Sequence, residues 1–131
     1  MADFPALGHV APTVKSCDAS RDWYAKLFGS EPVIDEDTGP WRHVVWALPG
    51  GTLIGIHEHP STPKDDEFSE YRLGLDHVSF HCASRGELQE WAGRLDDLGI
   101  KNGGVIDAPY GSGVSFRDPD GNALEFFAGP E

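Results

Sequence analysis

The chain contains GHVAPTVKSCDASRDWYAKLFG (residues 8–29) and, further on, DHVSFHCASRGELQEWAGRLDDLG (residues 76–99). In both stretches His-Val opens an alternating segment, and a Trp follows the His by fourteen residues: Trp23 after His9, and Trp91 after His77. A Leu four residues later and then a Gly complete both stretches. Matches at several offsets predict two copies of one supersecondary unit.

Each copy is predicted to contain one helix after its first strand. In the second copy, Ser84 and Glu87 have the spacing of a capping box, and Gly99 suits the position just past the helix end. Between them, apolar residues at helical spacing form one stripe: Leu88, Trp91, Leu95 and Leu98. In the first copy we expect Asp18 to be the N-cap and Gly29 to end the helix.

Three strand-like segments follow each helix, so each copy is β-α-β-β-β. The expected strands are 31–37, 41–48 and 52–58 in the first copy, and 101–107, 112–117 and 122–128 in the second. We therefore predict a single α+β domain over 1–131, with module one at 7–58, a linker at 59–74 and module two at 75–128. The sheets are expected to form a curled mixed sheet around a metal-binding cleft, with the helices outside.

Composition limits the classes of function. A chain of 131 residues forms one ordinary domain, and its formal net charge of −12 argues against nucleic acid and anionic membrane surfaces as partners. Its two cysteines, Cys17 and Cys82, form no CxxC pair and are expected to be free thiols. The N-terminal residues lack a basic segment followed by an apolar run, which predicts no signal peptide and a cytoplasmic location.

Alternation along the strands places candidate ligands on one face of each module. His9 shares its face with Ala11 and Thr13, whereas His77 shares its face with Ser79 and His81. The more apolar residues on the other faces are expected to pack under the helices, so both His-bearing faces should point into the cleft.

Glu125 lies in the middle of an apolar last strand, where a carboxylate is costly to bury without a partner. With His9 and His77 it makes a two-His, one-carboxylate set that suits Fe2+, Mn2+ or a related divalent ion such as Ni2+ or Zn2+. The pattern leaves an alternative open, because a strand His is often structural and a Glu can pair with Arg or Lys.

Nearly the whole chain resembles the vicinal oxygen chelate superfamily (glyoxalase/bleomycin resistance protein/extradiol dioxygenase-like). The residues that carry the resemblance are Gly8-His9-Val10, Trp23-Tyr24, Leu27-Phe28-Gly29, Leu75 to Phe80 and Asp118 to Glu125. The family's metal ligands lie on the first strand of each module and on the last strand of the second. Residue by residue, the resemblance implies His9, His77 and Glu125 as ligands, and a homodimer as the assembly.

A fourth ligand is present in the glyoxalase I branch, usually a Glu on the last strand of the first module. The equivalent residue here is Gly55, and His57 lies two residues further along the same face. The Gly puts glyoxalase I activity in doubt and is more like the three-ligand dioxygenase and fosfomycin-transferase branches. His57, His81 and Tyr110 are the candidate acid–base residues, although a structural role is open for each.

Two functions remain in competition. One is a metal-dependent lyase, isomerase or dioxygenase that acts on a small oxygen-chelating substrate. The other is a protein that sequesters an antibiotic or metabolite, as the bleomycin-resistance proteins do. The bleomycin-resistance proteins lack the metal ligands, whereas all three candidate ligands are present in this sequence.

Overall fold

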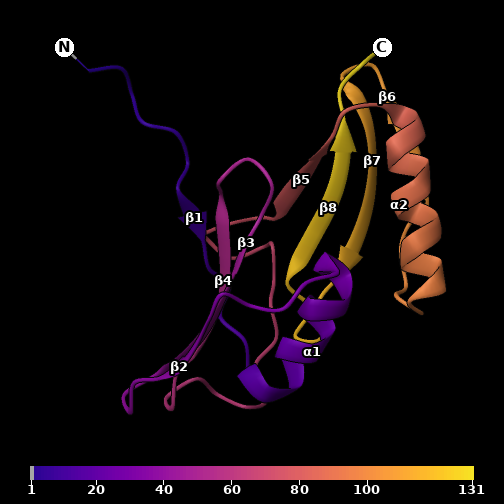
Figure 1. Cartoon of the computed structure of the whole chain (residues 1–131). Coiled ribbons are helices and arrows are strands. Elements are labelled where there is room, and N and C mark those ends of the chain that lie inside the picture. The colour runs from indigo at the N-terminus through magenta and orange to yellow at the C-terminus, as the bar shows by residue number, and fades with distance from the viewer. Residues whose placement is uncertain (1) are drawn as a thin grey trace. The chain divides into compact units, whose positions relative to one another are not determined.

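The computed structural model describes residues 2–131 and confirms an α+β fold of two βαβββ modules (Figure 1). The chain divides into two compact units between Asp66 and Glu67. The first contains β1 (His9–Val10), α1 (Cys17–Phe28), β2 (Ile34–Asp37), β3 (Arg42–Ala47) and β4 (Leu53–Glu58). The second contains β5 (Val78–Cys82), α2 (Arg85–Asp97), β6 (Ile106–Ala108), β7 (Gly111–Arg117) and β8 (Ala123–Ala128).

Each unit builds a four-stranded mixed sheet with the same topology. The strand orders are β1-β4-β3-β2 and β5-β8-β7-β6, and in each sheet the first strand pairs with the last in parallel while the other pairs are antiparallel. The registers also correspond, since Val45 lies opposite Gly55 on β3 and β4 as Ser115 lies opposite Glu125 on β7 and β8. Gly55 and Glu125 therefore occupy equivalent positions.

One helix packs against one face of each sheet, and the core lies between them. In the first unit Tyr24 and Leu27 of α1 are buried, and the Tyr24 ring contacts Trp46 with centroids 5.9 Å apart. In the second unit Leu88 and Leu95 are fully buried on α2, which runs alongside β7 and β8 in Figure 1. Burying one such aliphatic side chain stabilises the fold by about 1.5–3 kcal/mol. We call the opposite face of each sheet its helix-free face.

The N-cap of α1 is Ser16, and the prediction of Asp18 at that position is wrong. The Ser16 side chain accepts a hydrogen bond from the Ala19 N–H, while Asp18 lies in the first turn and pairs with Arg42. Glu58 of β4 accepts a 2.7 Å hydrogen bond from the Cys17 N–H at the same helix end. Both carboxylates therefore favour this helix N-terminus, where unpaired N–H groups carry partial positive charge.

The capping of α2 agrees with the predicted capping box. Ser84 accepts a hydrogen bond from the Glu87 N–H at 3.1 Å, and the Glu87 carboxylate accepts one from the Ala83 N–H at 2.7 Å. Gly99 has φ of 73°, the left-handed conformation in which Gly ends helices at low cost.

Two strands are shorter than predicted. β1 stops at Val10, because Pro12 has no N–H to continue a ladder, and only an isolated bridge joins Thr13 to His57 further on. β6 covers Ile106–Ala108 alone, since Gly104 turns the preceding chain with φ of 70°. The remaining strands lie within two to three residues of their predicted bounds.

Cys17 and Cys82 are free and buried, as expected. Burial raises the pKa of each thiol to about 11. No helix within residues 2–131 is long and apolar enough to cross a membrane.

Candidate metal centre

Two of the three predicted ligands come together in the second unit. Glu125 on β8 and His77, which immediately precedes β5, place Oε1 and Nε2 3.8 Å apart. The parallel pairing of β5 with β8 brings the two chain segments side by side on the helix-free face. The Glu125 side chain is 24% exposed and that of His77 46% exposed, so both side chains are partly accessible to solvent.

Residues of both adjacent strands adjoin the Glu125 carboxylate. Ser79 of β5, in register with Glu125, donates its hydroxyl hydrogen bond to Oε1 at 2.9 Å. On β7, a Cβ at Gly113 would lie 3.2 Å from Oε2. The absence of a side chain at position 113 therefore leaves the space that the carboxylate occupies.

The His77 ring is held from its other side. Its Nδ1 lies 2.7 Å from Oδ1 of Asp76. A carboxylate only accepts hydrogen bonds, so Nδ1 is the donor, and in the neutral ring Nε2 then carries the lone pair. Nε2 is also the nitrogen nearest to Glu125.

This donor set fits a divalent metal ion. An imidazole nitrogen and a carboxylate oxygen each bind such ions at about 2.0–2.2 Å, so two donors of one ion lie up to about 4 Å apart. Within either unit, no three His, Cys, Asp or Glu side chains of residues 2–131 gather closely enough to hold an ion. The second unit therefore supplies a pair of donors, and the third predicted ligand, His9, is an exposed residue of the first unit.

The helix-free face of the first unit carries a cluster of aromatic rings in place of the carboxylate. His57 stacks on Trp41 with centroids 5.1 Å apart and an interplanar angle of 19°. His43 meets both rings edge-on, at 4.6 Å from Trp41 and 5.5 Å from His57. His59 stacks beyond His57 at 6.2 Å.

Burial lowers the pKa of His57, and the neighbouring histidines His43, His59 and His9 lower it further. The lowered pKa favours the neutral ring, which has one unprotonated nitrogen. The Glu36 carboxylate holds His43 by a contact of 3.0 Å to Nε2. His57 thus combines a packed aromatic setting with a lowered pKa.

The first unit has little space for a fourth ligand at the position equivalent to Glu125. A Cβ at Gly55 would lie 3.3 Å from the Val44 carbonyl oxygen and 3.3 Å from Val45 Cγ2. A backbone oxygen at that distance cannot easily withdraw. The local packing therefore favours Gly at this position.

His81 and Tyr110 lie near the second unit's helix-free face. His81 is an exposed residue of β5 in register with Phe127, and Tyr110 is 74% exposed. The Tyr110 ring stacks on Phe127 with centroids 6.2 Å apart. Phe127 follows Glu125 by two residues on the same face, so both predicted residues lie further along that face than the His77–Glu125 pair.

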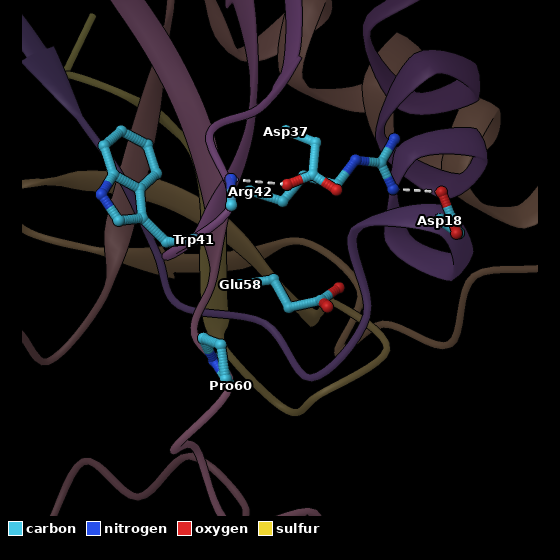
Figure 2. Close-up of a pocket in the computed structure, with 7 residues that line it drawn as sticks. Asp18, Asp37, Trp41, Arg42, Glu58 and Pro60 are labelled. Carbon is cyan, nitrogen blue, oxygen red and sulfur yellow. Dashed lines mark hydrogen bonds and ion pairs between the residues drawn. The ribbon is translucent and has the colours of Figure 1, made fainter.

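A cavity of about 390 Å³ lies in the first unit, and the residues that line it are other than the predicted site residues. It is lined by Asp18, Asp37, Gly39, Trp41, Arg42, Glu58 and Pro60. Figure 2 shows Arg42 reaching toward Asp18, while Trp41 points to the other side of the strand. Arg42 pairs with Asp18 and Asp35, and Glu58 caps α1. Three of the charged side chains that line the cavity, Asp18, Arg42 and Glu58, therefore join α1 to the sheet.

Three residues around the pair were not identified as contributors from the sequence. Alternation placed Ser79 on the right face, but its bond to Glu125 needs the register of β5 with β8. The role of Gly113 also depends on that sheet. Asp76 had a direct signal, since a carboxylate beside a candidate His ligand is a common second partner of metal-binding imidazoles.

Comparison with known proteins identifies the family. The sequence model of the Glyoxalase/Bleomycin resistance protein/Dioxygenase superfamily matches residues 6–126. The chain belongs to this superfamily. The resemblance inferred from the motifs is thereby confirmed.

Relatives within the superfamily differ in activity. The chain is 28% identical to Glyoxylase I 4 of Arabidopsis thaliana over 92% of its own length and 68% of the relative's. It is 27% identical to biphenyl-2,3-diol 1,2-dioxygenase 3 of Rhodococcus globerulus, over 97% of this chain and 67% of that protein. A solved glyoxylase/bleomycin resistance protein/dioxygenase domain from Frankia sp. EAN1pec superposes with a TM-score of 0.87 at 31% identity, covering 98% of this chain and 100% of that one.

Proposed function

We propose that this protein is a divalent-metal-dependent enzyme that acts on a small substrate able to chelate the metal through neighbouring oxygen atoms. The proposed ligands are His9, His77 and Glu125, and the ion is Fe2+, Mn2+, Ni2+ or Zn2+. The observation that carries the proposal is the 3.8 Å approach of His77 Nε2 to Glu125 Oε1. An imidazole and a carboxylate side by side are two-thirds of the donor set that leaves coordination positions open for substrate.

The relatives support a bound metal ion as part of the proposal, and they point to two reaction classes. One protein of the same fold, the fosfomycin resistance protein FosX of Listeria monocytogenes, was crystallised with Mn(II) and sulfate. It is 19% identical, with a TM-score of 0.70 over 98% of this chain and 93% of that one. The names of the sequence relatives give a glyoxylase and a ring-diol dioxygenase. We therefore propose a lyase or isomerase on one side, or a dioxygenase on the other.

When bound, the ion supplies Lewis acidity that polarises substrate oxygens. The chain's own residues supply the proton transfers. His57 accepts a proton at its unprotonated nitrogen, since burial lowers its pKa and so favours the neutral ring. His81 and Tyr110 are the other proposed acid–base groups.

Elemental analysis tests the proposal. Protein purified anaerobically is expected to carry about one Fe, Mn, Ni or Zn per chain, and the His77→Ala/Glu125→Ala double variant is expected to carry none. His59→Ala, which removes a histidine outside the proposed ligand set, is the matched control and keeps the metal. A wild-type chain that stays metal-free after reconstitution contradicts the proposal.

A second candidate is a protein that sequesters a small ligand without chemistry. The stack of Trp41 on His57 favours it, since an accessible indole ring on a protein of net charge −12 suits an aromatic cation. Titration with cationic glycopeptides, followed by Trp fluorescence in wild type and Trp41→Ala, distinguishes the two functions. A homodimer and a cytoplasmic location stay predictions from the sequence.

A further inference from the structure

We propose that Asp76 and Ser79 are positioning residues that fix the two donor atoms of the second unit before a metal binds. Asp76 sets the tautomer and the orientation of the His77 ring, and Ser79 fixes the carboxylate of Glu125. This inference rests on the proposed metal-binding function and assigns two further residues to that site.

The contact at Asp76 determines which nitrogen of His77 is available. Free imidazole rings exchange between two neutral tautomers, and only the one protonated at Nδ1 has a lone pair on Nε2. Asp76 Oδ1, at 2.7 Å from Nδ1, accepts the hydrogen of that tautomer. The lone pair then lies on the nitrogen 3.8 Å from Glu125 Oε1. A metal would meet a ring already in the binding form.

Ser79 acts on the partner atom. Its hydroxyl donates to Oε1 of Glu125 at 2.9 Å, and Oε1 is the oxygen that faces His77. The bond fixes one carboxylate oxygen in place, while Gly113 leaves room for the other. Fixing donors in advance reduces the conformational entropy that is lost when a ligand binds.

The first unit shows that the fold itself requires neither residue. The residue before His9 is Gly8, and the position equivalent to Ser79 is Ala11, yet β1 pairs with β4 in the register that β5 uses with β8. The position equivalent to Glu125 is Gly55, so the unit that lacks the carboxylate also lacks both supporting side chains. Ser79 therefore lies in the unit that has a carboxylate to hold, and Asp76 distinguishes His77 from its counterpart His9, which follows Gly8.

The first measurement is metal affinity, with Mn(II) and Zn(II) as probes in competition with a chromophoric chelator. Loss of such supporting partners weakens metal binding about 10- to 100-fold, which is the range expected for Asp76→Ala. Ser79→Ala is expected to weaken it about tenfold, and Asp76→Glu to restore part of the loss. The control for charge is Asp97→Ala, at an exposed end of α2. The control for the hydroxyl is Ser115→Ala, which lies opposite Glu125 on β7.

The second measurement needs no metal. Nitrogen-15 chemical shifts of the His77 ring, recorded at a pH where the ring is neutral, are expected to show the Nδ1–H tautomer in wild type and a shift toward Nε2–H in Asp76→Ala. Equal tautomer populations in the two proteins would overturn the role of Asp76. Equal metal affinities of each variant and its control would overturn the positioning roles alone. A wild type that binds neither ion would instead overturn the proposed function.

Discussion

Position for position, Gly8, Ala11 and Gly55 of the first module correspond to Asp76, Ser79 and Glu125 of the second. The backbone plan, strand order and register are common to both modules. One module thus carries a carboxylate–imidazole pair with its supporting hydrogen bonds, and the other carries stacked rings. The backbone positions are thus common to both modules, and the side chains on the helix-free faces differ.

The largest expected effect comes from a glycine that only the second module requires. Gly111 begins β7 with φ of 141°, and a Cβ there would lie 2.4 Å from the Ala128 carbonyl oxygen and 2.5 Å from the Phe127 ring. The equivalent residue of the first module is Trp41, which has a large side chain. Gly111→Ala is therefore expected to lower the free energy of unfolding by about 2–4 kcal/mol, measured by urea denaturation.

Gly93→Ala provides the control for that measurement. Gly93 lies within α2, where a Cβ meets nothing within 4 Å, so Ala is expected to stabilise by about 0.5–1 kcal/mol. If Gly111→Ala did not lower the free energy of unfolding, the second module would not require Gly at this position, and the close approach of β7 to β8 would not distinguish it from the first module.

The fold could be predicted from the sequence because its signals are local. The repeat, the Ser84–Glu87 capping box and the positive-φ glycine Gly99 need no knowledge of tertiary structure. The N-cap of α1 could not be predicted in the same way. Ser16 and Asp18 are both good capping residues, and contacts from distant strands decide between them, since Arg42 pairs with Asp18.

The sequence was enough to predict on which sheet face the candidate site lies, and some of the residues that form it. Alternation placed His77 and Glu125 on helix-free faces, and the sheet register brings them together. The contact of Asp76 with His77 was not predicted, because alternation places neighbouring residues on opposite faces of a strand. β5 begins only at Val78, so Asp76 and His77 precede the strand and are free to meet.

A smaller effect tests whether the first module accepts a carboxylate at the equivalent position. Gly55→Ala is expected to cost about 1–2 kcal/mol of unfolding free energy, because the Val44 carbonyl oxygen lies 3.3 Å from the new Cβ. Gly55→Glu is expected to cost more and to leave the metal content per chain unchanged. Tighter metal binding by Gly55→Glu would mean that the first module can supply a fourth ligand.

The smallest effect concerns the pH dependence of stability. Burial lowers the pKa of His57 in the folded protein below the ordinary histidine pKa of about 6.5, so the unfolded chain takes up the proton first as pH falls. Stability should therefore decrease as pH drops from about 6.5 through the folded-state pKa. His57→Phe, which copies Phe127 of the second module, is expected to flatten this part of the curve in thermal unfolding at a series of pH values. If the stability of wild type and of His57→Phe changed with pH in the same way, His57 would not be the group that causes this pH dependence.

The two buried thiols have a use that follows from where they lie. Cys17 belongs to the first unit and Cys82 to the second, and each has a pKa of about 11. Because the thiolate is the reactive form, neither reacts readily with a disulfide reagent until its surroundings open. The rate of modification at each cysteine therefore records how often that half of the chain opens in native conditions. Each unit therefore has its own internal probe of local opening.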